Sequence, residues 1–509
     1  MRITQTLRRA VQTRADATAT ICGNREQTWR ELRDRVARLA GALHGLGVQA
    51  EDRVAILALN SDRYLEYLYG VSWAGAAANP VNIRLAPPEI AYTLEDSESR
   101  VLFVDDAFAP VVAQIRAQLP ALEHVVFIGD GELPEGCLAY EDLIANHAPA
   151  AEAEVRGDAL AGLFYTGGTT GKSKGVMLSH DAIVYNMLNM LPMLGYDQTA
   201  VYLHAAPMFH LADMANTHAV TAVGGTHCVI PRFDIDALLA MIARGKVTHT
   251  MLVPTMINML VSSGKLEGAD IASLRRMLYG ASPMPEALLL RAMKALPGVG
   301  FVQGYGQTEA APVVTLLPAE AHYPGSDKLT SAGVPAYGVD VAIMDEAGSE
   351  VATGTVGEVC ARGLNIMQGY WKRPEQTAET LRDGWLRTGD LGYMDGDGYV
   401  FIVDRAKDMI ISGGENIFSV EVEGAIYQHP DVQETAVIGL PSEQWGEAVH
   451  AVIVLREGGT ATEADIIAHC RGLIADYKLP RSISFREEAL PLSGAGKILK
   501  TELRKELAG

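Results

Sequence analysis

Residues suited to binding a polyphosphate are concentrated in one short segment, 165–176. Its twelve residues include four glycines, three threonines, one serine and two lysines. Glycine lets backbone N–H groups come close to an anion, while hydroxyl and ammonium groups add donors and positive charge. A Walker A loop would require glycine at position 166, where this chain has threonine. The segment therefore predicts a phosphate-binding loop that is not of the Walker A type.

Two apolar runs flank this segment and favour a binding loop over a flexible surface connection, which would have a similar composition. Residues 159–165 and 175–179 each predict a buried strand. A loop held between two buried strands is well placed to bind a ligand. The alternative to this prediction is a flexible surface connection.

The composition predicts a globular protein of two or more domains. The chain has 509 residues, of which 48% are hydrophobic and 20% are charged, and its net charge is −20. Such a negative charge argues against nucleic acid or an anionic membrane surface as a partner. It does not argue against an anionic nucleotide, because a local pocket of basic residues can override the overall charge.

The cysteines and the N-terminal segment indicate a cytoplasmic protein. Five scattered cysteines without a C-x-x-C pair indicate neither a disulfide framework nor a zinc knuckle, and they fit a reducing compartment. The N-terminal arginines are not followed by an apolar core, so a secretory signal is not expected. No run of strongly apolar residues is long enough to predict a transmembrane segment.

Helix and strand patterns alternate along most of the chain, which predicts an α/β fold. Thr28 and Glu31 have the spacing of a capping box and predict the start of an amphipathic helix. Turn-rich sequence at 384–398 precedes a predicted strand at 399–403, and a domain boundary is expected near 404–408. The residues beyond it predict a small domain with the order strand, helix, strand, strand, helix at 409–412, 420–428, 434–440, 449–455 and 463–474.

Several short motifs follow the phosphate loop in a fixed order. They are Pro-Met-Phe-His at 207–210, Tyr-Gly-Ala-Ser-Pro at 279–283, Gly-Tyr-Gly-Gln-Thr-Glu at 304–309, Thr-Gly-Asp at 388–390, Val-Asp-Arg-Ala-Lys-Asp at 403–408, Ser-Gly-Gly-Glu-Asn at 412–416 and Gly-Lys at 496–497. With these motifs the chain resembles, over essentially its whole length, the AMP-forming acyl-CoA synthetases of the adenylate-forming superfamily. Bacterial fatty-acid CoA ligases resemble it most, and 4-coumarate:CoA ligases are near relatives. Gly167 and Ser173 depart from the family, which usually has serine and proline there.

The resemblance implies a large multi-subdomain N-terminal adenylation domain at 1–404 and a small mobile α+β domain at 409–509. The large domain is expected to include a β-barrel-like element, and residues 405–408 are the expected hinge. The implied reaction uses ATP, Mg²⁺, coenzyme A and a carboxylic acid, first forming an acyl-adenylate and then a thioester. The oligomeric state is left open, with a homodimer as one option.

The resemblance also implies an ATP site. Its expected residues are Thr166, Gly167, Gly168, Thr169, Thr170, Gly171, Lys174, Gly280, Ala281, Ser282, Tyr305, Asp390 and Arg405. The carboxylate of Asp390 would accept hydrogen bonds from both ribose hydroxyls, and Tyr305 would stack on adenine. The alternatives are a turn aspartate, a surface ion pair for Arg405 and a plain core aromatic for Tyr305.

The catalytic residues implied by the resemblance are Lys497, Glu309, Thr308 and the hinge residue Lys407. Glu309 and the hydroxyl of Thr169 would bind Mg²⁺, Thr308 would contact the α-phosphate, and Lys497 would reach both the acid and the α-phosphate. From composition alone, Lys497 would be a solvated lysine. For the second step, Gly413 and Gly414 would line the thiol tunnel. Weaker candidates for contacts with the CoA nucleotide are Trp445, Arg481 and Arg84.

The expected acyl pocket contains His210, Met214, Gly304 and Ala310. Small residues and methionine favour a medium- or long-chain fatty acid. An aromatic acid of the hydroxycinnamate or benzoate type is the close alternative, and loading of a carrier protein instead of CoA is another. Asp213 could reach a polar group of the substrate or form a salt bridge. The remaining histidines of this part of the chain lack zinc-ligand spacing and are expected to be structural or exposed: His204, His218 and His227.

Overall fold

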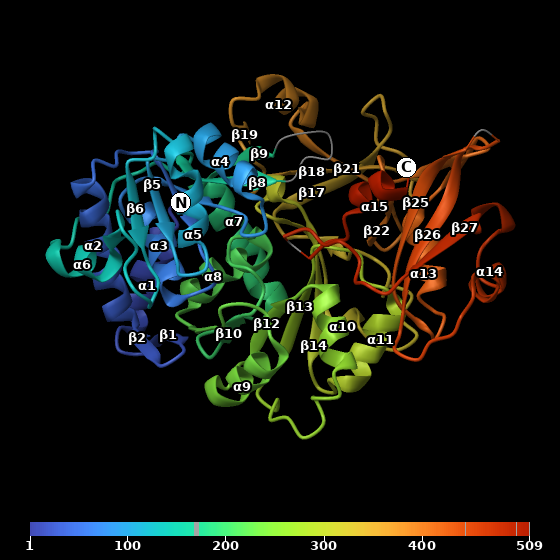
Figure 1. The fold of residues 1–509 in the computed structure, drawn as a ribbon, viewed down its shortest axis with the longest axis horizontal. Coiled ribbons are helices and arrows are strands. Elements are labelled where there is room, and N and C mark those ends of the chain that lie inside the picture. The colour runs from blue at the N-terminus through green and yellow to red at the C-terminus, as the bar shows by residue number, and fades with distance from the viewer. Residues whose placement is uncertain (167–172, 443, 495, 508–509) are drawn as a thin grey trace.

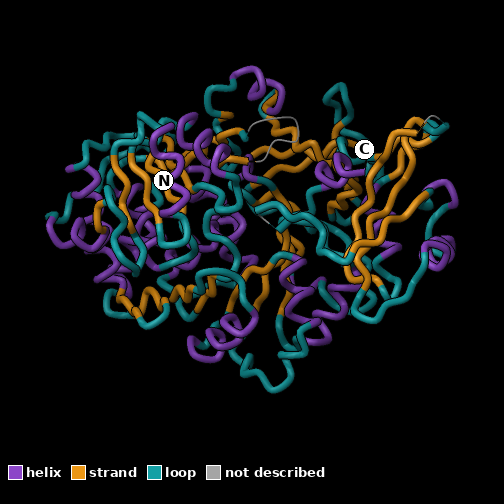
Figure 2. Tube along the Cα trace, in the orientation of Figure 1, coloured by secondary structure: helices purple, strands orange, loops and turns teal. Residues whose placement is uncertain are grey.

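The computed structural model spans residues 1–509 and describes all of them except 167–172, 443, 495 and 508–509. The described residues form four sheets with helices packed around them, which confirms the predicted α/β class (Figure 1). Figure 2 shows strands in the interior of the N-terminal region and helices around them. We call residues 1–404 the N-terminal region and residues 409–509 the C-terminal region.

The first sheet has nine strands and a mostly parallel core, as expected for a sheet buried on both faces. In spatial order its strands are β16 (Val334–Pro335), β15 (Val313–Leu317), β14 (Gly300–Gly306), β13 (Arg276–Gly280), β12 (His249–Leu252), β10 (Val201–His204), β11 (Thr226–Val229), β1 (Thr18–Cys22) and β2 (Arg25–Thr28). Two motifs lie at the carboxyl ends of adjacent parallel strands, because β13 ends at Gly280 and β14 contains Tyr305. Carboxyl ends of parallel strands are where α/β sheets usually bind ligands.

The second sheet carries the two strands that flank the phosphate loop. Its strands are, in spatial order, β19 (Gly369–Tyr370), β9 (Lys174–Ser179), β8 (Leu160–Thr166), β4 (Ala77–Pro80), β3 (Arg53–Leu57), β5 (Val101–Val104), β6 (His124–Phe127) and β7 (Leu138–Ala139). The hairpin of β8 and β9 is antiparallel and pairs Thr166 with Lys174 at the ends of the loop. Both strands are largely buried, as their apolar sequences predict.

The helices of the N-terminal region pack against these two sheets. They are α1 (Thr4–Arg14), α2 (Trp29–Gly45), α3 (Asp62–Trp73), α4 (Pro87–Asp96), α5 (Ala109–Ile115), α6 (Tyr140–Asn146), α7 (His180–Leu194), α8 (Leu211–Val223), α9 (Ile235–Gly245), α10 (Pro254–Ser262), α11 (Glu286–Ala295) and α12 (Pro374–Thr380). The predicted capping box is present, since the Thr28 hydroxyl accepts from the Glu31 N–H and Glu31 accepts from the Thr28 N–H. No helix among the described residues has both the length and the apolar character needed to cross a membrane.

A third, antiparallel sheet stands where the barrel-like element was expected. Its strands are β17 (Val339–Met344), β18 (Gly357–Gly363), β21 (Trp385–Met394), β20 (Leu381–Arg382) and β22 (Val400–Arg405), the last paired with β21. This pairing sets Asp390 directly opposite Arg405.

The C-terminal region has its own sheet and its own hydrophobic clusters. The strands are β24 (Glu415–Ile417), β23 (Ile410–Ser412), β26 (Gly446–Leu455), β25 (Val432–Ser442) and β27 (Ser482–Arg486), and the helices are α13 (Ser419–Ile426), α14 (Glu463–Arg471) and α15 (Lys500–Leu507). The predicted hinge at 405–408 begins at the last residue of β22 and precedes β23, and these two strands belong to different sheets.

Candidate active site

The phosphate loop is anchored at both ends, although its centre, 167–172, lies outside the described residues. The predictions for Gly167, Gly168, Thr169, Thr170 and Gly171 therefore concern residues that the structure does not describe. At the carboxyl end of the loop, the Ser173 carbonyl accepts a hydrogen bond from the Tyr92 hydroxyl at 3.2 Å.

Lys174 and Glu309 meet at the side chain of Tyr370. The Lys174 ammonium lies 4.2 Å from the centre of the Tyr370 ring, and the Tyr370 hydroxyl donates to Glu309 Oε1 at 2.8 Å. Glu309 and Thr308 lie in a short 3₁₀ turn, η2 (Thr308–Ala310), that follows β14. Lys174 of β9 and Glu309 of η2 thus contact the same side chain, beside the predicted phosphate loop. The sequence patterns gave no signal for Tyr370, because an isolated Gly-Tyr-Trp triplet has no diagnostic spacing.

Asp390 is held by two side chains and is only 6% exposed. The Tyr305 hydroxyl donates to Asp390 Oδ2 at 2.8 Å, and Arg405 Nε lies 3.3 Å from Asp390 Oδ1. Burial, and then the charge of Asp390, raises the pKa of Tyr305 well above its usual value, so its hydroxyl keeps the proton that it donates. The structure therefore brings the three predicted residues together and gives the Tyr305 hydroxyl a partner that the sequence did not predict.

Gly280, Ala281 and Ser282 lie beside Tyr305 because β13 and β14 are neighbours. A side chain at Gly280 would collide with the carbonyl of Gly304 on β14, so glycine is required by the close approach of the two backbones. Ala281 has a φ of +64°, a strained value for a residue with a side chain. Such strain is common where a backbone is shaped around a ligand.

The loop that carries Lys497 docks against the N-terminal region. A side chain at Gly494 would collide with Asn82, and one at Gly496 would lie 3.0 Å from Val253 Cγ2. The loop also closes on itself, since the Ser493 N–H donates to the Lys497 carbonyl at 2.7 Å. In Figure 1 this C-terminal segment, drawn in red, enters the space between the two regions.

The Lys497 ammonium interacts electrostatically with four charged residues of the site. Burial, followed by repulsion from Arg405, lowers its pKa to about 8, while Asp390 and Glu309 oppose that shift and Lys407 adds to it. The prediction from composition alone, a solvated lysine, is wrong. The Lys497 ammonium instead lies within electrostatic range of Asp390 and Glu309, and its catalytic role stays a prediction.

Lys407 and Arg405 border this cluster from the expected hinge. Burial, and then the charge of Arg405, lowers the pKa of Lys407. Asp404, the residue before Arg405, accepts from the Ser419 N–H at 2.5 Å and so contacts the first residue of α13 in the C-terminal region. The assignment of a hinge stays a prediction.

Of the four expected acyl-pocket residues, two keep an exposed surface. His210 is the N-cap of α8, where its Nδ1 accepts from the Ala212 N–H at 3.2 Å. Burial and the charge of Lys497 lower the pKa of His210 to about 3, so the ring is neutral and lies near Lys497. Gly304 is partly exposed, but Met214 and Ala310 are 1% and 0% exposed. These two side chains are packed in the hydrophobic core.

Asp213 does not face a substrate site, which corrects one of its two expected roles. It is fully buried, accepts from Tyr202 at 2.9 Å and pairs with His204 Nδ1 at 2.6 Å. His204 Nε2 in turn lies 3.0 Å from Nδ1 of the buried His227. The histidines are structural, as expected, and no group of metal-binding side chains is found in the described part of the chain.

Three of the residues proposed for CoA lie together in the C-terminal region, where Trp445 is near both Arg481 and Gly413. The Arg481 guanidinium stacks 5.2 Å from the Trp445 ring, and a side chain at Gly413 would lie 3.0 Å from Trp445 Cε3. Gly413 and Gly414 have φ values of +62° and +87°, so the backbone alone explains both glycines. Arg84 is exposed on the N-terminal region. Their roles stay predictions.

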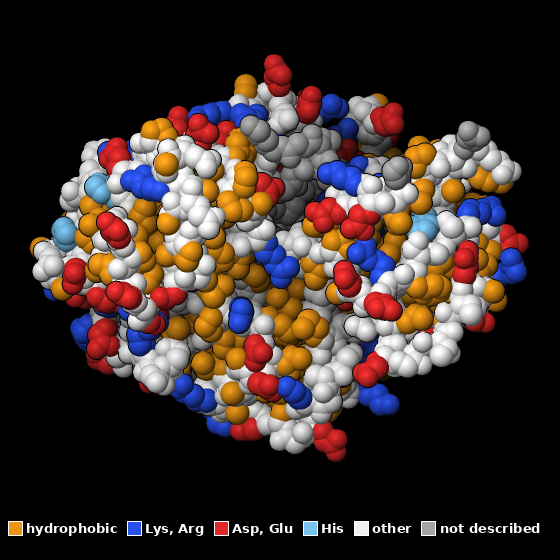
Figure 3. Space-filling model, in the orientation of Figure 1, with side chains coloured by type: hydrophobic (Ala, Val, Ile, Leu, Met, Phe, Trp, Pro, Cys, Tyr) orange, Lys and Arg blue, Asp and Glu red, His pale blue; other side chains and the backbone are white. Residues whose placement is uncertain are grey.

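One face of the molecule has a recess. Figure 3 shows this recess near the centre of the view, with basic and acidic side chains at its rim. Lysine and arginine beside two carboxylates can bind a polyphosphate together with a second anion, because both signs of charge are present. The arrangement is therefore suited to joining two negatively charged reactants.

Comparison with known proteins assigns this geometry to one family. The AMP-binding enzyme family matches residues 7–371, and the AMP-binding enzyme C-terminal domain matches residues 421–497. A feruloyl-CoA synthase of Amycolatopsis sp is 40% identical over 494 residues, which cover 96% of each chain. A long-chain-fatty-acid–CoA ligase of Mycobacterium tuberculosis is 36% identical over 94% of this chain and 93% of its own. The crystal structure of an anthranilate CoA ligase in complex with anthranoyl-AMP has a TM-score of 0.92 and 32% identity, covering 99% of this chain and 97% of the other.

Proposed function

Because the chain belongs to the family of AMP-binding enzymes and is an AMP-forming acyl-CoA synthetase, we propose that its acid is a compact aromatic carboxylate. The class of reaction is an ATP-dependent ligation of an acid to CoA through an acyl-adenylate. The finer proposal concerns the benzoate or hydroxycinnamate type of acid.

The burial of Met214 and Ala310 is the observation that carries this proposal. A long fatty acid needs a channel lined by exposed apolar atoms, but Met214 and Ala310 have almost no exposed surface. The apolar side chains that are partly exposed and pack against the same core include Ala212, Met256, Ala281 and Tyr305. Small residues beside a methionine and an aromatic ring suit a short, flat ligand. The relatives that act on feruloyl and anthranoyl groups agree with this choice.

A medium- or long-chain fatty acid is the second candidate. It is favoured by the long-chain-fatty-acid–CoA ligase that is 36% identical to this chain. Methionine side chains such as Met214 can also move to open a channel for a flexible ligand. The two acids differ in the volume that they require beyond His210, so a direct comparison of substrates separates them.

We assign the first chemical step to the residues around Lys497. A carboxylate oxygen attacks the α-phosphorus of ATP, and the bond from that phosphorus to the bridging oxygen breaks, releasing pyrophosphate. Both reactants are anions, so the ammonium of Lys497 reduces their repulsion and stabilises the charge that develops at the α-phosphate. Asp390 and Arg405 would hold the ribose, and Thr308 would contact the α-phosphate.

Glu309 fits a Mg²⁺ ion that arrives with the nucleotide. Its Oε1 accepts from Tyr370, which leaves Oε2 for a hard cation, and one protein carboxylate plus substrate oxygens is a usual Mg²⁺ environment. The ion would neutralise phosphate charge. Thr169, the other predicted ligand, lies outside the described residues. In the second step the CoA thiolate attacks the acyl carbon and AMP leaves.

The pKa of Lys497 predicts how adenylation depends on pH. The ammonium is charged below a pKa of about 8 and neutral above it, so kcat/KM for pyrophosphate formation is expected to fall as pH rises through about 8. The pH dependence of kcat/KM reports the pKa of Lys497 in the free enzyme, so the charge of a bound nucleotide does not shift that pKa. Initial rates between pH 6.5 and 10, the endpoints chosen as about two units around that pKa, give the profile. A flat profile up to pH 10 would contradict the role of Lys497 as a proton-dependent cation.

The acid is tested by pyrophosphate release with ATP, Mg²⁺ and CoA across a panel of acids, with the thioester identified by mass. The decisive pair is coumarate and a linear fatty acid of equal carbon number, because the two differ in shape more than in apolar size. We expect a kcat/KM for the aromatic acid at least about tenfold higher, the effect of roughly 1.4 kcal/mol of binding.

Three other results of the panel have a clear meaning. A maximum at one linear chain length would overturn the aromatic proposal and support the second candidate. A maximum at acetate would overturn both. Pyrophosphate without any CoA thioester would indicate a carrier-protein acceptor.

A further inference from the structure

Tyr370 links the two sides of the phosphate site and lies outside every motif in the sequence. It is the second residue of β19, a strand of only two residues at the edge of the second sheet. The strand pairs with β9 directly after the phosphate loop, with Tyr370 opposite Val176. Residues next to Tyr370 extend this connection, because the Met367 N–H donates to the Glu309 carbonyl at 2.8 Å and the Trp371 N–H donates to the Gly175 carbonyl at 2.8 Å.

The side chain of Tyr370 makes two different contacts with charged groups. Its hydroxyl donates to Glu309 Oε1 at 2.8 Å, a charge-assisted hydrogen bond that fixes how the carboxylate is turned. The face of its ring lies 4.2 Å from the Lys174 ammonium, within the range of a cation–π interaction. Burial, and then the charge of Glu309, raises the pKa of Tyr370, so the hydroxyl remains a donor at neutral pH.

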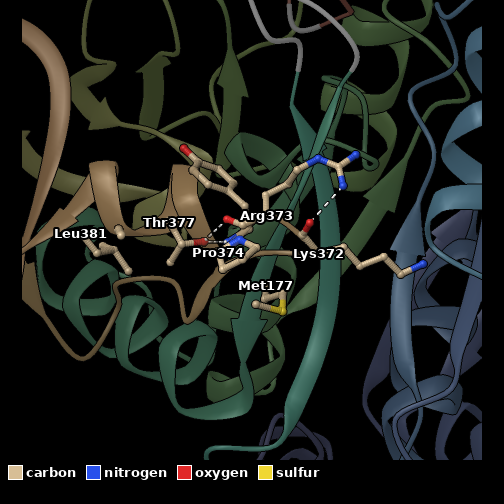
Figure 4. A pocket seen from close by; sticks show the side chains of 8 residues that line it. Met177, Lys372, Arg373, Pro374, Thr377 and Leu381 are labelled. Atoms are coloured by element: carbon tan, nitrogen blue, oxygen red, sulfur yellow. Dashed lines mark hydrogen bonds between the residues drawn. The ribbon is translucent and has the colours of Figure 1, made fainter.

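The backbone of Tyr370 is held in place from the opposite side. The Tyr370 N–H donates to Thr377 Oγ1 at 2.9 Å, and that hydroxyl donates to the Arg373 carbonyl at 2.8 Å. Figure 4 shows Thr377, Pro374 and Leu381 around a cavity of about 410 Å³ that Tyr370 also lines. Helix α12 packs closely against β19, because a side chain at Gly369 would lie 2.7 Å from Thr377 Cγ2. Tyr370 is thus supported by α12 while its hydroxyl extends to Glu309.

We propose that Tyr370 is a positioning residue for adenylation. Through its hydroxyl it orients Glu309 toward the metal ion, and through its ring it holds Lys174 at the phosphates. The inference rests on the proposed roles of Glu309 and Lys174. It adds a residue that sets the distance between the cationic and anionic sides of the phosphate site.

The two contacts can be removed one at a time. Tyr370→Phe removes the hydroxyl and keeps the ring, so it should affect Glu309 only. Tyr370→Leu removes both and should also release Lys174. Because Glu309 acts through the metal and Lys174 acts directly on phosphate, the first variant should weaken metal binding alone. The second should also weaken the binding of metal-free ATP.

A matched control exists elsewhere in the same region. The Tyr140 hydroxyl donates to Glu66 Oε2 at 2.5 Å, a buried tyrosine–glutamate pair on α6 and α3. Tyr140→Phe makes the same chemical change in a pair that lies outside the candidate site. It should lower the thermal midpoint without changing nucleotide or metal binding.

The experiment measures binding and needs neither acid nor CoA. Electron paramagnetic resonance follows the binding of Mn²⁺ to the full-length protein in the presence of a non-hydrolysable ATP analogue, and calorimetry measures binding of that analogue without metal. For Tyr370→Phe we expect the Kd of Mn²⁺ to rise about tenfold, a typical effect of one hydrogen bond to a charged group, with metal-free binding unchanged. Activity of this variant should recover when the Mg²⁺ concentration is raised.

Two results would overturn the inference. One is an unchanged Kd of Mn²⁺ in Tyr370→Phe; the other is an equal loss in Tyr370→Phe and Tyr140→Phe, which would indicate a general structural effect. The failure of the proposed substrate would look different. A wild-type protein that prefers linear acids, with Mn²⁺ binding that still depends on the Tyr370 hydroxyl, would overturn the aromatic acid and leave the role of Tyr370 intact.

Discussion

Replacing Lys497 by alanine is expected to abolish acyl-adenylate formation while leaving the conversion of a supplied acyl-adenylate to the CoA thioester. The reason is the position of Lys497. Its loop packs against Asn82 and Val253, and its ammonium interacts electrostatically with Asp390 and Glu309. Removing one preorganised charge at such a site costs about 10²–10³-fold in rate. Pyrophosphate release measures the first step, and thioester formation from synthetic acyl-adenylate measures the second.

Lys505 supplies a control of the same residue type in the same region. It is exposed on α15, so Lys505→Ala should leave both steps unchanged. If Lys497→Ala slows both steps equally, the assignment of Lys497 to adenylation alone is wrong. If it slows neither, the docked position of the loop has no part in the chemistry.

Replacing Asp213 by alanine is expected to lower the free energy of unfolding of the N-terminal region by about 2–6 kcal/mol, at roughly 1–3 kcal/mol for each of two buried hydrogen-bond donors left unpaired. Asp213 is fully buried on α8 and accepts from both Tyr202 and His204. Without the carboxylate these two donors are left unpaired in the interior, and the contact between His204 and His227 loses its support. Urea unfolding followed by tryptophan fluorescence measures the effect, because the ring of the buried Trp29 lies 5.8 Å from that of His227.

The matched surface change is Asp236→Ala. Asp236 is 73% exposed, and its ion pair with Lys265 at 2.7 Å should contribute less than about 1 kcal/mol. An Asp213→Ala protein as stable as Asp236→Ala would contradict the structural role. If that variant were stable and had also changed its preference among acids, Asp213 would instead be a specificity residue.

Local sequence patterns were sufficient for the individual elements. The strands β5 and β6 are short apolar runs, and α2 begins at the capping box of Thr28 and Glu31. Such elements depend on hydrogen bonds and side-chain periodicity within a few residues, so their signals are present in the sequence itself. The order of the motifs was likewise sufficient for the family, which the comparisons confirm.

The composition of the expected acyl pocket was not sufficient to predict the substrate. Small residues and Met214 indicated volume for a long acid, whereas the side chain of Met214 is 1% exposed in the structure. Composition states which groups are present near a site and not whether a space remains between them. The preference for a fatty acid therefore stays a prediction beside the aromatic acid.

The sequence by itself determined the fold class and the family, because both are encoded in residues that are close together or in a fixed order. Only the tertiary structure decided which side chains meet. Tyr370 lies in β19 and Glu309 in η2, 61 positions apart in the sequence. Asp213 of α8 is held in the interior by partners on another element, β10. These contacts depend on how sheets and helices pack against one another, and no local periodicity or spacing carries that information.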